Sequence, residues 1–119
     1  MDSKELSERL LNFAVNIYFF SKKLKVDFID QKILQQLVNS SSSAGANYQE
    51  ACAAESKADF IHKMQIVLKE LRESKYWLVF IERVEIGKNE VLSPLIIESD
   101  ELIKIIARSV ITAKHQKTR

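Results

Sequence analysis

The stretch SSSSAG, Ser40 to Gly45, decides how many helices this chain forms. Serine hydroxyls compete for backbone hydrogen bonds and glycine weakens helices, so such a stretch is typical of a loop or linker. A spacing of three and four residues nevertheless continues through it, at Leu34, Leu37, Ser41, Ala44, Tyr48 and Ala51. Because a linker has no reason to keep this phase, the pattern predicts one helix over residues 27–54. A flexible loop is the alternative.

The same stretch predicts a narrow section inside that helix. Ser41, Ala44 and Gly45 stand where bulky residues would otherwise be, and one glycine costs a helix only about 1 kcal/mol relative to alanine. The lost bulk allows a neighbouring backbone or a large side chain to come close. That neighbour is either the following helix of the same subunit or a second subunit.

Two segments flanking this helix also show helical spacing. Over residues 3–25, apolar residues recur at steps of three and four, after Asp2 and Glu5, which resemble a capping pair. A third helix is predicted to start at Ser56, with Asp59 three residues later. Its apolar face is formed by Phe60, Met64, Val67, Leu71, Leu78 and Ile81.

A fourth helix is predicted from its start signals. Gly87 is expected to end the third helix, and Ser93 with Pro94 suits an N-cap and a first helical position. For the early part of this helix, PLIIESDE at residues 94–101, an irregular conformation is an alternative. Four amphipathic segments with short connections predict an all-α, up-down-up-down antiparallel four-helix bundle, with residues 1–119 as a single domain.

Composition favours a globular protein of the cytoplasm. The single cysteine, Cys52, cannot form an internal disulfide, and its alanine neighbours suggest a small buried residue. The N-terminus lacks the basic and apolar regions of a signal peptide. No apolar run approaches the roughly 20 residues that span a bilayer, so no membrane association is expected.

The run YWLVFI, Tyr76 to Ile81, is apolar on every side. A strand is the competing explanation, but the run continues a helical period without a preceding turn. One core-facing stripe cannot bury all of it, and an exposed apolar patch usually marks an interface. We therefore expect a homo-oligomer whose contacts include Tyr76, Trp77, Phe80 and Val84. Simple core filling by Trp77 and Phe80 is the alternative.

Positive charge collects late in the chain, and no acid follows Glu101. The basic residues concerned are Lys104, Arg108, Lys114, Lys117 and Arg119. Cations also favour a helix C-terminus and improve solubility, which is the alternative explanation. Repeated around an oligomer, they would give salt-dependent phosphate contacts, so they predict RNA or DNA binding without base-specific readout. Lys69, Arg72 and Lys75 form a second, weaker basic patch.

Enzymatic signatures are sparse. Arg108 and His115 fit the loose R-x(4-6)-H spacing of a helical-bundle ribonuclease class, in which the histidine acts as acid or base. Asp59 and His62 could place two metal ligands on one helical face, without the second pair that a di-iron bundle needs. Phosphate-binding, dinucleotide and nucleophile-elbow motifs do not occur. We therefore expect no enzyme, no cofactor and no metal, and keep a metal-independent ribonuclease as the least favoured alternative.

Two motifs in fixed order carry a family resemblance. A small-residue stretch leads into an A-N-x-x-E-A pattern, formed by Ser43, Gly45, Ala46, Asn47, Glu50 and Ala51. A D-F-I-x-K pattern followed by K-E-x-x-E-x-x-Y-W-L is formed by Asp59, Phe60, Lys63, Lys69, Glu70, Glu73, Tyr76, Trp77 and Leu78. Together they resemble the bacterial four-helix-bundle proteins encoded in intervening sequences of 23S ribosomal RNA genes, over most of the chain.

This resemblance implies a helical subunit of a homopentamer with a central channel. A more distant relative is similar to the accessory protein of diversity-generating retroelements, a basic pentamer that binds nucleic acid and a reverse transcriptase. For Asn47 and Glu50 it favours hydrogen bonds across helices or a place along the channel, with a solvated face as the alternative. The function expected is a non-enzymatic accessory factor associated with nucleic acid; a purely structural or protein-interaction module is the alternative.

Overall fold

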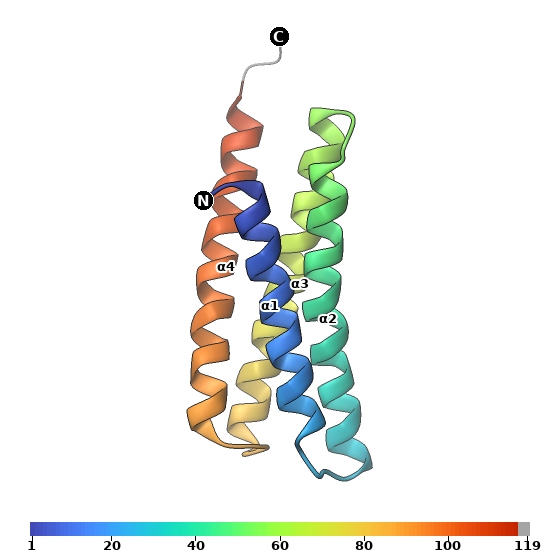
Figure 1. Ribbon diagram of the computed structural model, residues 1–119, viewed down its shortest axis with the longest axis vertical. Helices are drawn as coiled ribbons and strands as arrows, with labels where there is room; N and C mark the ends of the chain where they lie inside the picture. Colours follow the sequence, from blue (N-terminus) through green and yellow to red (C-terminus); the bar gives the residue numbers. More distant parts are fainter. Residues whose placement is uncertain (117–119) are drawn as a thin grey trace.

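Four antiparallel helices make up the computed structural model, which describes residues 1–116 (Figure 1). They are α1 (Ser3–Lys22), α2 (Phe28–Cys52), α3 (Lys57–Arg83) and α4 (Asn89–His115). Each helix packs against the next, and α4 returns beside α1, so α1 and α3 lie diagonally opposite each other. Buried apolar side chains from all four helices form one core along a bundle 54 Å long. The predicted up-down-up-down bundle is confirmed.

The first three helices begin where capping side chains stand. The carboxylates of Asp2 and Asp27 and the hydroxyl of Ser56 each accept a hydrogen bond from a backbone N–H three residues later, at 2.8, 2.9 and 3.0 Å. Such bonds satisfy N–H groups that have no partner within the helix. None of the four helices carries an apolar stretch long enough to cross a bilayer.

SSSSAG lies inside α2, so the prediction of one continuous helix is confirmed. The Ser40 hydroxyl shares a hydrogen bond of 2.9 Å with that of Ser74 on α3. On another side of α2, a β-carbon at Gly45 would lie 3.8 Å from the backbone of Leu10 on α1. The hydroxyls of three of the four serines also donate hydrogen bonds to backbone carbonyl oxygens about one turn earlier in α2. Both neighbouring helices of the same subunit, α1 and α3, therefore pack closely against the narrow section.

The last residue of α2 corrects one expectation. Cys52 is exposed, whereas Ala51 beside it is buried in the core. Successive helical residues point about 100° apart, and at the end of α2 this rotation carries the Cys52 side chain out of the core that Ala51 faces. The prediction of a buried cysteine was wrong.

The predicted start of α4 at Ser93 and Pro94 was also wrong. The helix begins at Asn89, and Pro94 and the seven residues after it are helical. Leu92 in the first turns is fully buried, so core packing extends the helix toward its N-terminus. Pro94 removes only the hydrogen bond to the carbonyl of Glu90, whose residue is exposed and can be hydrated.

Helix α3 ends at Arg83, before the predicted Gly87. The N–H of Ile86 donates to the carbonyl of Ile81 at 3.1 Å, and the N–H of Glu85 donates to that of Glu82 at 3.2 Å. These two bonds form a Schellman motif, in which Glu85 adopts the left-handed conformation, with φ 61°. The motif ends the helix without a glycine at the left-handed position.

Gly87 has a different role, in the α3–α4 turn. Its φ of 80° is also left-handed, and a β-carbon there would lie 2.9 Å from the Phe20 ring. Phe20 is buried at the end of α1. Gly87 thus lets the turn pass close to the core.

Candidate interaction surfaces

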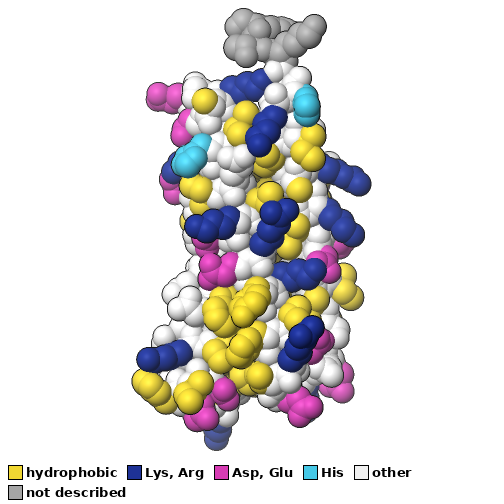
Figure 2. Space-filling view, turned by 180° about the vertical axis from the view of Figure 1, so that it is seen from behind, with side chains coloured by type: hydrophobic (Ala, Val, Ile, Leu, Met, Phe, Trp, Pro, Cys, Tyr) yellow, Lys and Arg dark blue, Asp and Glu magenta, His cyan; other side chains and the backbone are white. Residues whose placement is uncertain are grey.

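Three aromatic side chains of α3 form an exposed cluster, Tyr76, Trp77 and Phe80, here called the aromatic surface. Ring centroids are 5.1 Å apart for Tyr76 and Trp77, 5.7 Å for Trp77 and Phe80, and 6.4 Å for Tyr76 and Phe80. Tyr76 is 60% exposed, and the other two are half-buried. Figure 2, seen from behind, shows hydrophobic side chains gathered in the lower half of this face.

The YWLVFI run as a whole is divided between core and surface. Leu78 and Ile81 are fully buried, and Trp77 packs partly against the core while its Nε1 donates to Glu73 at 3.3 Å. Val84, the C-cap of α3, is exposed. Helix rather than strand is therefore confirmed for this run, and its excess apolar surface remains in contact with solvent in the subunit.

The predicted cations of α4 do not form one compact patch. Lys104 and Arg108 lie one turn apart on one exposed stripe. Lys114 is exposed too, but six residues beyond Arg108 it is rotated by about 240° at 3.6 residues per turn. Lys117 and Arg119 lie outside the described residues.

Acids near Lys104 and Arg108 are engaged elsewhere. Asp100 forms an ion pair of 2.6 Å with Lys75 of α3, and Glu101 forms one of 2.9 Å with Arg9 of α1. Within residues 1–116, Lys104 and Arg108 form no ion pair. Their charge is therefore available to an external anion, whereas Lys75 of the weaker predicted patch is neutralised.

A third cation joins these two from α3. Since Lys75 is paired with Asp100, antiparallel packing places Arg72, three residues before Lys75, level with Lys104, four residues after Asp100. Arg72 is exposed. We call Arg72, Lys104 and Arg108 the basic surface.

Asn47 and Glu50 have partners within the subunit. The Asn47 amide donates to the carbonyl of Ser43 at 2.9 Å and to its hydroxyl at 3.1 Å. Glu50 accepts from Lys63 of α3 at 2.9 Å. Thus Glu50 bonds across helices, and Asn47 bonds along its own helix.

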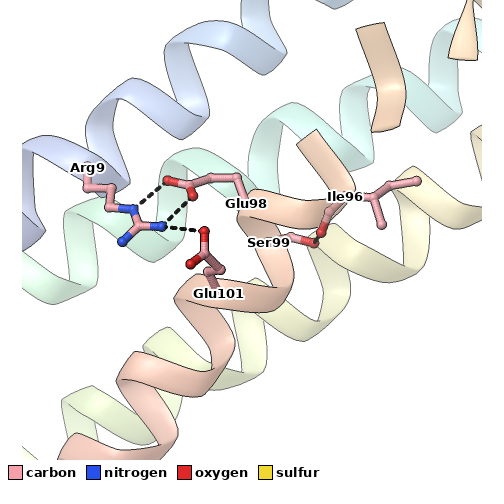
Figure 3. Close-up of polar contacts among 5 residues, drawn as sticks. All are labelled: Arg9, Ile96, Glu98, Ser99 and Glu101. Atoms are coloured by element: carbon pink, nitrogen blue, oxygen red, sulfur yellow. Dashed lines mark hydrogen bonds and ion pairs between the residues drawn. The ribbon is translucent and has the colours of Figure 1, made fainter. Parts of the chain in front are cut away.

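An ion-pair cluster joins α1 to α4, and sequence reasoning missed it (Figure 3). Arg9 donates from Nε and Nη2 to the two carboxylate oxygens of Glu98, at 2.7 and 2.6 Å, and from Nη2 to Glu101 at 2.9 Å. The hydrogen bond to Glu98, with the charges of both acids, raises the pKa of Arg9 despite its partial burial. No local pattern links residues so far apart in sequence.

The seam bridged by Arg9 is the most open in the bundle. Of the helix pairs in contact, α1 and α4 are the least closely packed. Two surface hollows of about 630 and 850 Å³ follow the seam and share Asn16, Pro94 and Leu95 in their walls. Arg9 therefore holds two helices together where apolar packing is thin.

The geometry adds no support for the ribonuclease pair, Arg108 and His115, or for the metal-ligand pair, Asp59 and His62. Arg108 and His115 are exposed on α4, and seven residues separate them by about 10 Å along the axis at 1.5 Å per residue. Asp59 and His62 are exposed on α3. Within residues 1–116, no group of three histidines, cysteines or acids is arranged to hold a metal ion.

Comparison with known proteins adds the family context. Residues 4–108 match the model of a family described as 23S rRNA-intervening sequence protein. A crystal structure from Bacteroides thetaiotaomicron, of a protein with unknown function from the S23 ribosomal protein family, is 34% identical with a TM-score of 0.79. The alignment covers 92% of this chain and 98% of that one. No curated protein matches the chain.

Proposed function

We propose that this chain, which belongs to the family of 23S rRNA-intervening sequence proteins, is a non-enzymatic homo-oligomer that binds RNA or DNA as an accessory factor in the cytoplasm. The observation that carries the proposal is a pair of exposed surfaces that share helix α3, where Tyr76 lies one turn after Arg72. The aromatic surface offers apolar area, and the basic surface offers cations without acidic partners in residues 1–116. Family resemblance favours a pentamer.

Self-association follows from the aromatic surface. Tyrosine, tryptophan and phenylalanine are enriched at the centres of protein interfaces, where they supply most of the binding energy. Tyr76 is largely exposed in the subunit although its two aromatic neighbours pack beside it. A second copy of the chain would remove this surface, with Val84 at its edge, from water.

Nucleic-acid binding follows from the basic surface. Three cations per subunit give weak phosphate binding alone, but a ring repeats them around its circumference. Phosphate contacts carry no sequence information, so we propose backbone binding without base readout. Lys114, Lys117 and Arg119 are proposed as additional contacts.

Light scattering coupled to size exclusion tests the oligomer. We expect a mass several times the 13.7 kDa of the subunit, and a shift toward monomer for Tyr76→Glu. Ile111→Glu is the matched control, because Ile111 is equally exposed but lies on α4, away from the aromatic surface. A monomeric wild type would refute self-association.

Fluorescence anisotropy with a labelled single-stranded RNA between 50 and 300 mM salt tests binding. Changing the three residues of the basic surface to alanine should weaken binding. The slope of log affinity against log salt should fall by about 2 for each subunit that the RNA contacts, at about 0.7 per phosphate. A variant with Lys22, Lys23 and Lys25 changed to alanine carries the same charge change elsewhere and should bind nearly as wild type. Equal losses would refute the site.

Failure to bind at 50 mM salt would instead support a protein-interaction module. Cutting of the RNA in the same assay, abolished by His115→Ala, would support the ribonuclease.

A further inference from the structure

Helix α1 exposes a second apolar surface. Leu11, Val15 and Tyr18 are 49%, 39% and 45% exposed and lie at steps of four and three along its outer side. Its inner side is buried in the core through residues that include Leu10 and Ile17. A helix that is apolar on both sides is typical of one that packs on both sides. We call Leu11, Val15 and Tyr18 the α1 stripe.

We propose that the α1 stripe of one subunit packs against the aromatic surface of the next, so that the subunits form a closed ring with α2 facing its axis. The inference rests on the proposed homo-oligomer and specifies its contact. The two surfaces differ in residues and lie on different helices, so their union is a heterologous, head-to-tail contact. Repetition of such a contact gives a closed ring when each subunit is rotated relative to the one before it by an angle that closes the circle.

Both surfaces face partly toward α2. Each contact therefore rotates the next subunit about an axis that lies on the α2 side of the bundle. Tyr18 lines a hollow at the α1–α2 seam together with Gln35 of α2. Trp77 lies on the flank of α3 near Ser74, which bonds to α2, and away from Lys75, which faces α4. The surfaces therefore flank α2 instead of standing back to back, and back-to-back surfaces would give a straight filament.

The height of the α1 stripe along the bundle follows from the close approach of Leu10 to Gly45, where a β-carbon would lie 3.8 Å from Leu10. Helices α1 and α2 run in opposite directions. Tyr18, eight residues after Leu10, is therefore level with the residue eight before Gly45, which is Leu37. Counting at 1.5 Å per residue places Tyr18 about 12 Å below Leu10 (Figure 1).

The aromatic surface lies at the same height. Ser74 of α3 contacts Ser40 of α2, and α3 also runs opposite to α2. Trp77, three residues after Ser74, is thus level with the residue three before Ser40, which is again Leu37. Rotation about an axis parallel to the bundle leaves every height unchanged, so the two surfaces meet when copies are arranged in a ring.

Charges beside the two surfaces are complementary at matching heights. Glu8 lies two turns before Val15 on the outer side of α1, and Lys69 lies two turns before Tyr76 on α3. The same counting separates Glu8 and Lys69 by two residues in height, about 3 Å. Both are exposed, and within residues 1–116 neither forms an ion pair. In the ring they would pair across each contact.

The face of α2 between the two surfaces suits an inner wall. Exposed residues over 35–49 are all uncharged, and they are Gln35, Gln36, Asn39, Ser42, Ala46 and Gln49. A polar, uncharged face can remain hydrated near its copies without repulsion between like charges. The cations of the basic surface lie on α3 and α4, away from this wall.

A charge swap tests the contact in the full-length protein. Glu8→Lys and Lys69→Glu should each raise the protein concentration at which the oligomer dissociates several-fold at low salt. Light scattering on a dilution series measures this concentration. The double variant should restore wild-type assembly, because the pair is reversed rather than lost. Losses that add in the double variant would overturn the inference.

Cysteine cross-linking gives an independent measurement in a Cys52→Ser background. Tyr18→Cys combined with Tyr76→Cys should produce a disulfide ladder of subunits on a non-reducing gel, and each single variant should remain uncross-linked. Dimers from Tyr76→Cys alone would show a two-fold contact and overturn the head-to-tail ring. A monomeric wild type would refute the proposed oligomer itself, whereas an oligomer with neither rescue nor ladder would refute only this contact.

Discussion

Arg9 and Glu98 lie 89 positions apart in the sequence, yet two hydrogen bonds of 2.6 and 2.7 Å join their side chains. They bridge the seam between α1 and α4, where the bundle is most open. A bidentate arginine–carboxylate pair fixes distance and direction together. It therefore sets where α1 lies against α4, in place of the close apolar packing found at the other seams.

Replacing Arg9 with alanine should lower the free energy of unfolding by about 1–2 kcal/mol, since a partly buried bidentate pair is worth more than an exposed one. The side chains of Arg9 and Glu98 are 27% and 28% exposed. Urea denaturation at low and high salt measures the loss, which should shrink in salt. Arg83→Ala, an exposed control on α3, should change stability by less than about 0.5 kcal/mol. Equal effects would contradict a special role for Arg9.

The two glycines should respond oppositely to alanine. At Gly45 a β-carbon meets only ordinary contacts with Leu10, so Gly45→Ala should stabilise α2 by about 0.5–1 kcal/mol. At Gly87 the left-handed backbone and the Phe20 ring both oppose a β-carbon, so Gly87→Ala should destabilise by more than about 1 kcal/mol. Thermal unfolding of both variants checks this. Loss of stability for Gly45→Ala would show that α1 cannot tolerate the added methyl group.

Glu85→Gly should stabilise the end of α3. The left-handed position of a Schellman motif is usually glycine, and another residue there costs about 1 kcal/mol. Glycine also gains freedom in the unfolded chain, so the net increase in the free energy of unfolding is expected to be about 0.5 kcal/mol. Chemical denaturation is the measurement. A decrease would mean that the Glu85 side chain contributes more than its backbone strain costs.

Glu70→Gln should make stability less dependent on pH. Burial, followed by the charge of Glu73, raises the pKa of Glu70 above its usual value, although Lys69 opposes the shift. The native state therefore holds this proton to higher pH than the unfolded state, and stability falls as pH rises through the native pKa. At pH 7 the variant should be more stable than wild type, and the difference should vanish below about pH 4. A constant difference across pH would contradict this assignment.

Local patterns predicted the helices better than they predicted helix ends. The caps at Asp2 and Ser56 are formed by residues within one turn, so the sequence shows them directly. The start of α4 was misplaced because Leu92 is drawn into the core by the other helices. The end of α3 was misplaced because Glu85 takes a backbone conformation that sequence normally assigns to glycine.

The candidate surfaces were predicted only in part. The excess apolar character of YWLVFI indicated the aromatic surface, and Tyr76 is indeed largely exposed. The same test applied to residues 10–20, LLNFAVNIYFF, would have indicated the α1 stripe, since that run is also apolar on most sides. Arg72 belongs to the weaker basic patch that the sequence predicts, but its position beside Lys104 depends on the register set by Lys75 and Asp100.

Local sequence patterns account for four amphipathic helices, for a second helix unbroken by SSSSAG, and for more apolar residues than one core can bury. These follow from the periodicity of side chains along one helix and from hydrogen bonds within one turn. Other features depend on the packing of the helices. Asp100 and Glu101 pair with Lys75 and Arg9, which leaves Lys104 and Arg108 without an ion pair within residues 1–116. Packing also makes α1 and α4 the most loosely packed neighbours and brings Tyr18 and Trp77 to one height. The reason is that register between helices is set by packing of residues far apart in sequence, such as Ser40 with Ser74 and Gly45 with Leu10.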